Sequence, residues 1–133
     1  MSPPQAWQPA VRLDAVGMRR LFGPLEADVM EVLWRECPVS APQVRAALPE
    51  AAALNTVVTV LGRLTAKGVL LRSGTRRHYR YAPTVGRDDF VAGVARRLVA
   101  GMVGDFGDVA AAAFAQAAVA PAPARGADRR GPS

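Results

Sequence analysis

A basic segment from Ala51 to Arg87 constrains this chain most, because its residue pattern predicts one helix followed by a β-hairpin. The segment contains no acidic residue and seven basic ones: Arg63, Lys67, Arg72, Arg76, Arg77, Arg80 and Arg87. The whole chain has 17 Lys and Arg against 11 Asp and Glu, a net charge of +6, so everything outside the segment sums to −1. Positive charge gathered on one compact element indicates a surface that neutralises phosphates, whereas charge spread over a chain indicates only solubility.

The spacing of apolar residues within this segment places its helix and its hairpin. Asn55 can cap the helix, and Gly68 can end it in a left-handed conformation. Between them, apolar residues recur at helical spacing and cover one side: Val57, Val60, Leu61 and Leu64. Residues 69–72 and 77–82 then predict two strands joined by a Ser-Gly-Thr turn.

Two shorter helices are predicted before the basic one. The first starts at Gly23-Pro24, where proline suits the first turn, and it ends before Pro38. The second starts at Ser40, which can form a capping box with Gln43. Three helices followed by a basic hairpin are typical of a winged helix-turn-helix domain.

The sequence predicts four parts. Residues 1–22 hold prolines and mixed polar residues without periodicity, which predicts a flexible arm. Residues 23–84 are predicted to form the winged helix-turn-helix domain, and residues 85–120 a helical dimerisation region. Residues 121–133 have the composition of a disordered tail. The predicted fold class is therefore mainly α with a small β-hairpin, a winged helix-turn-helix domain followed by C-terminal dimerisation helices.

An apolar stripe at helical spacing follows the predicted domain. Its members are Phe90, Val91, Val94, Leu98, Met102 and Phe106. A lone helix cannot hide such a stripe from water, and a helix added after a complete small core usually buries it against a partner. The simplest partner is a second copy of the chain, so these residues predict a homodimer.

The residue inventory argues against an enzyme and against a bound cofactor. Cys37 and His78 are the single cysteine and the single histidine, too few for a soft-ligand metal site or an internal disulfide. The sequence contains no Walker loop, no Gly-x-Ser-x-Gly turn and no cluster of His, Cys and carboxylates. It also lacks a signal-peptide core and a run of about 18 apolar residues, which predicts no membrane insertion and a cytoplasmic location.

The predicted third helix and hairpin would divide the contacts to double-stranded DNA between them. Short hydrogen-bonding side chains and one arginine would face base edges in the major groove: Asn55, Thr56, Thr59 and Arg63. Longer cations at the helix end and on the hairpin would contact the phosphate backbone: Lys67, Arg72, Arg76 and Arg77. Exposed threonines and arginines are also ordinary solvated residues, and Asn55 has the alternative role of a cap. Arg80 and Arg87 are expected to be structural or solvated.

The chain resembles the penicillinase-repressor (BlaI/MecI) family of winged-helix transcriptional regulators in three stretches, LEADVMEVLW, NTVVTVLGRLTAKGVLLR and HYRYAP. The resemblance covers about Gly23 to Phe114. It implies a repressor that binds a palindromic operator as a homodimer, with Thr56, Thr59 and Arg63 facing the bases. For family members paired with a membrane sensor protease, it implies derepression by cleavage in the carboxy-terminal half.

Three departures from the family pattern concern the carboxy-terminal region. Ala113-Phe114 stands where cleaved relatives have Asn-Phe, so induction by cleavage does not follow from the resemblance. The Cys-x-Cys motifs of copper-responsive relatives are absent, which excludes copper sensing by that route. The tail AVAPAPARGADRRGPS replaces a helix rich in Glu and Leu that strengthens the family dimer. Two alternatives stay open, a winged-helix protein-interaction module and a ligand-responsive regulator without proteolytic induction.

Overall fold

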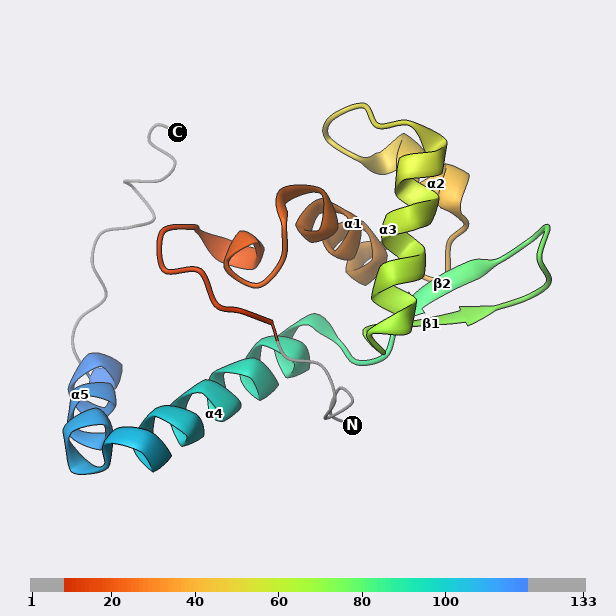
Figure 1. The fold of residues 1–133 in the computed structure, drawn as a ribbon. Coiled ribbons are helices and arrows are strands. Elements are labelled where there is room, and N and C mark those ends of the chain that lie inside the picture. Colours follow the sequence, from red (N-terminus) through yellow and green to blue (C-terminus); the bar gives the residue numbers. More distant parts are fainter. Residues whose placement is uncertain (1–8, 120–133) are drawn as a thin grey trace. The chain divides into compact units, whose positions relative to one another are not determined.

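The computed structural model describes residues 9–119, which form helices and one β-hairpin (Figure 1). The chain forms two compact units, and the boundary between them lies within its fourth α-helix, after Val94. The elements in chain order are the 3-10 helix η1 (Gly17–Arg20), α1 (Pro24–Arg35), α2 (Ala41–Ala47), α3 (Leu54–Ala66), β1 (Leu70–Ser73), β2 (Arg80–Pro83), α4 (Arg87–Phe106) and α5 (Asp108–Val119). This order confirms the predicted fold class. The predicted tail, residues 121–133, lies outside the described residues, as do the first eight residues of the predicted arm.

Helix α1 begins where the sequence predicts it. Pro24 occupies its first turn, where the missing N–H costs no helical hydrogen bond. The Glu26 carboxylate accepts a hydrogen bond from the Gly23 N–H at 3.3 Å and lies at the positive end of the helix dipole. One side of the helix is buried in the domain core: Ala27, Val29, Met30, Val32 and Leu33.

Helix α2 begins with the capping box that the sequence predicts. The Ser40 hydroxyl accepts a hydrogen bond from the Gln43 N–H at 3.4 Å, and the Gln43 side-chain oxygen accepts one from the Ser40 N–H at 2.8 Å. Both bonds satisfy backbone donors that a helix start leaves without intrahelical partners. Val44 anchors this short helix in the core, because its side chain is fully buried.

Helix α3 packs on α1 and α2 (Figure 1) through the apolar side that its spacing predicts. The buried residues are Val57, Val60, Leu61 and Leu64. The predicted cap at Asn55 is wrong, because Ala53 is the N-cap residue and the helix starts at Leu54. Ala53 has the extended backbone of a cap but no side-chain acceptor, so residue preference alone points to the wrong position. Gly68 follows the helix with a positive φ of 85°, as predicted.

The hairpin pairs β1 with β2 in antiparallel register, from Leu70 opposite Pro83 to Ser73 opposite Arg80. Both strands lie later in the chain than the predicted ranges, and the turn between them is longer than three residues. Gly74 in this turn has φ +87°, and a Cβ there would collide with the His78 carbonyl. The turn therefore needs glycine at this position.

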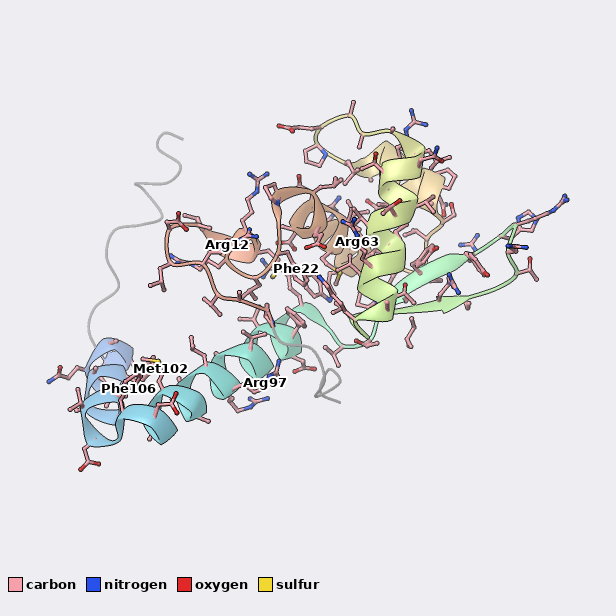
Figure 2. The ribbon with its side chains drawn as sticks, in the orientation of Figure 1. Arg12, Phe22, Arg63, Arg97, Met102 and Phe106 are labelled. Carbon is pink, nitrogen blue, oxygen red and sulfur yellow. The ribbon has the colours of Figure 1, made fainter. Side chains whose placement is uncertain are left out.

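Residues 9–22 pack on the domain, which corrects the predicted flexible arm for this part of the chain. Met18 and Phe22 are buried in the core, and Figure 2 labels Phe22 in this segment. Arg12 donates from Nη1 to the Phe22 carbonyl at 2.8 Å, and Arg20 donates from Nη1 to the Arg12 carbonyl at 3.1 Å. A backbone hydrogen bond from the Arg12 N–H to the Arg20 carbonyl at 2.8 Å also closes this segment around η1, and no periodic pattern in the sequence reveals such contacts.

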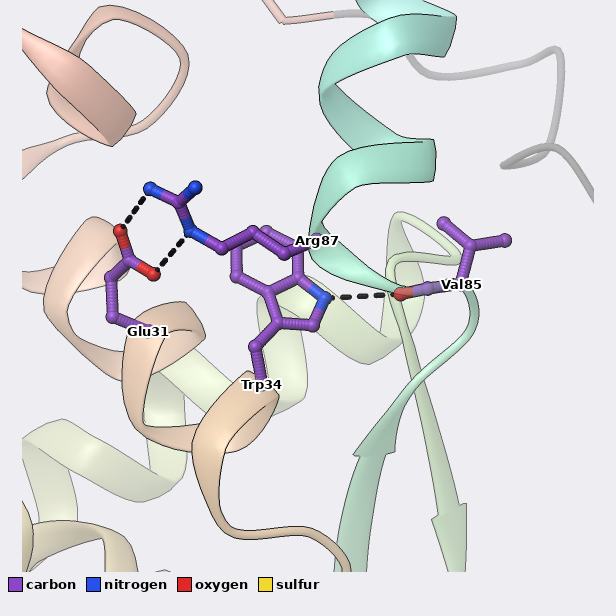
Figure 3. A network of polar contacts seen from close by, with 4 residues as sticks. All are labelled: Glu31, Trp34, Val85 and Arg87. Atoms are coloured by element: carbon purple, nitrogen blue, oxygen red, sulfur yellow. Dashed lines mark hydrogen bonds and ion pairs between the residues drawn. The ribbon is translucent and has the colours of Figure 1, made fainter.

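Polar contacts join the start of α4 to α1 (Figure 3). The Trp34 indole donates from Nε1 to the Val85 carbonyl at 3.0 Å. Arg87 donates to both carboxylate oxygens of Glu31, from Nε at 2.8 Å and from Nη2 at 2.9 Å. These hydrogen bonds raise the pKa of the Arg87 guanidinium above its ordinary value, because they stabilise its charged form. The predicted structural role of Arg87 is confirmed by this pair.

The second unit contains the C-terminal part of α4 and the whole of α5. Gly107 links the two helices with a positive φ of 62°, which lets the chain reverse without strain. Ala110 is the buried residue of α5, a helix otherwise built mostly from exposed alanines. Within residues 9–119, none of the helices has the length and apolar character needed to cross a bilayer.

Candidate nucleic-acid interface

The exposed side of α3 carries all four side chains that the sequence predicts for base contacts. Asn55, Thr56, Thr59 and Arg63 are exposed, and Figure 2 labels Arg63 on this helix. The buried side of the same helix is filled by apolar residues, so the helix cannot rotate to hide these polar groups without exposing the core. The fold therefore presents this side of α3 to solvent.

A hydrogen bond within α3 fixes what Thr59 can offer to a ligand. Its hydroxyl donates to the Asn55 carbonyl one turn earlier at 2.9 Å. The hydroxyl hydrogen is therefore committed to the backbone, while the methyl group and an oxygen lone pair remain available. Such a threonine can contact a thymine methyl or accept a hydrogen bond from an adenine or cytosine amino group.

The cations predicted for the phosphate backbone differ in their surroundings. Arg76 and Arg77 are exposed in the turn of the hairpin. The Arg72 guanidinium lies over the Tyr79 ring at 4.0 Å from its centroid, which orients it on β1. The Lys67 ammonium forms an ion pair with the Glu26 carboxylate at 3.6 Å. Lys67 therefore contributes less net positive charge to this surface than the sequence predicts.

A cleft of about 570 Å³ lies between α2, the first half of α3 and the hairpin. Among the described residues that line it, none is acidic: Ser40, Ala41, Pro42, Gln43, Leu54, Val58, Arg76, Arg77, His78, Tyr79, Arg80 and Tyr81. Its lining combines polar, cationic and apolar side chains, which suit a sugar–phosphate strand with its anionic phosphates and apolar deoxyribose.

The apolar residues that line this cleft include two that sequence reasoning missed. Leu54 and Val58 are 36% and 44% exposed, although both are apolar and lie in the middle of a packed domain. They are four residues apart and therefore neighbours on the helix surface. The signal was present in the sequence, because neither residue belongs to the set that fills the buried side of the helix.

Arg80 is held by the fold, as the sequence predicts for it. Its Nη1 donates to the Pro38 carbonyl at 3.3 Å, which joins β2 to the segment that leads into α2. Next to it, Val39 and Tyr81 exchange both backbone hydrogen bonds, at 3.1 Å and 2.8 Å. The hairpin is therefore anchored to the helical part of the domain at its base and extends from it toward the turn.

The predicted dimerisation stripe divides into two groups in the structure. Phe90 and Val94 are 1% and 6% exposed and belong to the core of the first unit, so neither is available to a partner, and their prediction is corrected. The Phe90 ring stacks on Phe22 with centroids 5.5 Å apart and contacts Trp34 at 5.6 Å. The other four members are exposed and stay a prediction: Val91, Leu98, Met102 and Phe106.

The Ala113-Phe114 peptide bond, which the resemblance to the family aligns with the bond cut in cleaved relatives, lies inside a helix. Ala113 and Phe114 are both within α5, and the Phe114 side chain is half-buried. Proteases bind their substrates in extended form, so this bond becomes a substrate only after local unfolding of α5.

A bundle of three helices with an exposed polar helix and an arginine-bearing hairpin defines a winged helix-turn-helix domain, a class that commonly binds DNA. The model of the family described as penicillinase repressor matches residues 22–123, and the chain belongs to this family. The transcriptional regulator BlaI of Mycobacterium tuberculosis, in strains CDC 1551 and H37Rv, is 45% identical over 76 residues. The match covers 55% of this chain and 55% of each relative, so the chain spans about half the length of these curated relatives.

Proposed function

We propose that this chain is a transcriptional repressor that occupies a palindromic DNA operator as a homodimer. The observation that carries the proposal is the cleft between α3 and the hairpin, with three arginines and no acidic residue among its described lining residues. Membership of the penicillinase repressor family and the likeness to transcriptional regulators named BlaI support the same function. In this proposal the protein acts on the DNA itself and needs no cofactor.

The roles proposed for individual residues follow from their exposure and their partners. Helix α3 enters the major groove, where Asn55, Thr56, Thr59 and Arg63 meet base edges. The hairpin lies on the backbone, where Arg76 and Arg77 pair with phosphates. Lys67 and Arg72 add phosphate contacts from positions already set by Glu26 and Tyr79. This division assigns sequence reading to the helix and most of the affinity to the hairpin.

The first test of this function is the salt dependence of binding to duplex DNA. Two copies that use three to five cations each would contact about six to ten phosphates, which predicts a slope of log affinity against log salt of about −5 to −9. Fluorescence anisotropy of a labelled duplex, selected by the protein from a random-sequence pool, measures this slope. Failure to enrich any sequence, or a slope near −2, would contradict the proposal.

A second prediction separates the helix from the hairpin. Arg63→Ala is expected to weaken binding to the selected duplex and relax the choice at one base pair per half-site, by about 1–3 kcal/mol. Arg76→Ala is expected to weaken selected and scrambled duplexes equally, because a phosphate contact carries no sequence information. Competition binding with both duplexes measures the two effects. The role assignment would be wrong if both variants lost the same affinity on both duplexes.

A further inference from the structure

Gly62 is placed in the interior of α3, where the fold has no use for a glycine. Glycine destabilises a helix interior relative to alanine, because it loses more backbone freedom on folding. Positive φ angles among the described glycines occur at Gly17, Gly68, Gly74 and Gly107, so Gly62 is not required by its backbone conformation. Apart from its two chain neighbours and the nearby backbone of its own helix, a Cβ added at Gly62 would meet no described atom of the chain within 4 Å. The chain itself therefore gives neither a conformational nor a steric reason for glycine here.

The reason for this glycine must be sought in what approaches α3 from outside. Gly62 is partly exposed and lies three residues after Thr59, so the two are neighbours on the helix surface, while Arg63 follows about 100° around the helix. Ala66 lies one turn further along the same side. Around Gly62 the surface of α3 is therefore made by the backbone, flanked by the Thr59 and Arg63 side chains.

We propose that Gly62 is a specificity-determining residue, at which the α3 backbone comes closer to a base edge of duplex DNA than a Cβ permits. The inference rests on the proposed function and adds to it a position that carries no side chain. A close backbone approach lets the short Thr59 side chain reach a thymine methyl or an amino group that a more distant helix would miss. It also selects against base pairs whose edges project into the space beneath Gly62.

The test is Gly62→Ala, measured by thermal unfolding and by binding to the duplex that the wild-type protein selects. The variant is expected to unfold at a higher temperature than the wild type, because alanine favours the helix. It is expected to bind the selected duplex on the order of tenfold more weakly, and a scrambled duplex of equal length with unchanged affinity. The opposite signs of the two effects exclude unfolding as the cause of weaker binding.

Gly104→Ala is the matched control. Gly104 is also a glycine within a helix, α4, and is exposed, and an added Cβ there meets no described atom within 4 Å beyond its chain neighbours and its own helix backbone. This variant is expected to gain thermal stability and to keep wild-type affinity for both duplexes. A loss of affinity in Gly104→Ala equal to that in Gly62→Ala would overturn the proposal, because the effect would not belong to α3.

Two negative results distinguish the inference from the function on which it rests. If the wild type binds its selected duplex with a steep salt dependence and Gly62→Ala binds equally well, the role of Gly62 is refuted and the proposed function stands. If the wild type selects no duplex, both fail together.

Discussion

Phe90→Ala is expected to destabilise the winged helix-turn-helix domain by about 3–5 kcal/mol, a large fraction of the roughly 5–15 kcal/mol that holds a typical domain folded. The Phe90 side chain is 1% exposed and its ring lies between those of Phe22 and Trp34. Truncation to alanine leaves a cavity that three elements border, the N-terminal segment, α1 and α4. Urea denaturation followed by tryptophan fluorescence measures the loss, with Trp34 as one of the chain's two tryptophans.

Val91→Ala is the control for this prediction. Val91 is the next residue of the same helix and is 39% exposed, so its truncation is expected to cost less than about 1 kcal/mol. The assignment of Phe90 to the core would be wrong if Phe90→Ala kept the wild-type denaturation midpoint while dissociating the proposed dimer. That outcome would instead support the prediction from sequence spacing that Phe90 lies in the dimer interface.

The observed position of Phe90 in the core illustrates what a periodic pattern can and cannot predict. Spacing of 3.6 residues identifies the apolar side of α4 correctly, because helix geometry alone determines which residues share a side. It does not identify what covers that side. Phe90 and Val94 are covered by the first unit, and the covering residue Phe22 comes from a segment without any regular pattern. Such long-range packing is a property of the folded chain and not of a local stretch of sequence.

Helix boundaries were predictable where a side chain determines them and less so elsewhere. Pro24 and the Ser40–Gln43 capping box set the starts of α1 and α2, and both predictions are confirmed. The start of α3 has no capping side chain, since Ala53 occupies the N-cap, and the best capping residue nearby misled the prediction. The observed strand limits in the hairpin also differ from the predicted ones, because the conformation of the turn between the strands depends on the backbone around Gly74.

The candidate site was predicted residue by residue from charge and residue type, but its chemistry depends on contacts that sequence does not give. The bond from the Thr59 hydroxyl to the Asn55 carbonyl decides which group Thr59 presents. The ion pair of Lys67 with Glu26 decides how much charge Lys67 adds. Both contacts are set by side-chain orientation, which helical spacing leaves open.

The start of α4 has more attachments to the winged helix-turn-helix domain than a simple linker would need. The Phe90 ring contacts the Trp34 ring. The Trp34 indole donates to the Val85 carbonyl, and Arg87 is paired with Glu31. These three kinds of contact fix the first turns of α4, up to Val94, within the first unit.

Met102→Glu is expected to convert the proposed homodimer into monomers and to lower affinity for the palindromic duplex by about 10²–10⁴-fold, the gain that linked binding of two half-sites provides. Met102 lies near the C-terminal end of α4 (Figure 2), between Leu98 and Phe106 on one side of the helix, and all three side chains are exposed within one chain. In a twofold symmetric interface each substitution occurs twice, so two carboxylates would be buried without partners. Sedimentation velocity measures the assembly, and anisotropy with the palindrome and with a single half-site measures the binding.

Ala100→Glu provides the matched control for this change. Ala100 is exposed on α4 and lies about 160° around the helix from Met102, so it introduces the same charge on the other side. The control is expected to stay dimeric with wild-type affinity, while Met102→Glu keeps only the weak affinity for a single half-site. A Met102→Glu protein that remains dimeric and binds the palindrome as the wild type does would show that the exposed stripe of α4 is not the interface. The dimer contact would then have to be sought elsewhere on the chain.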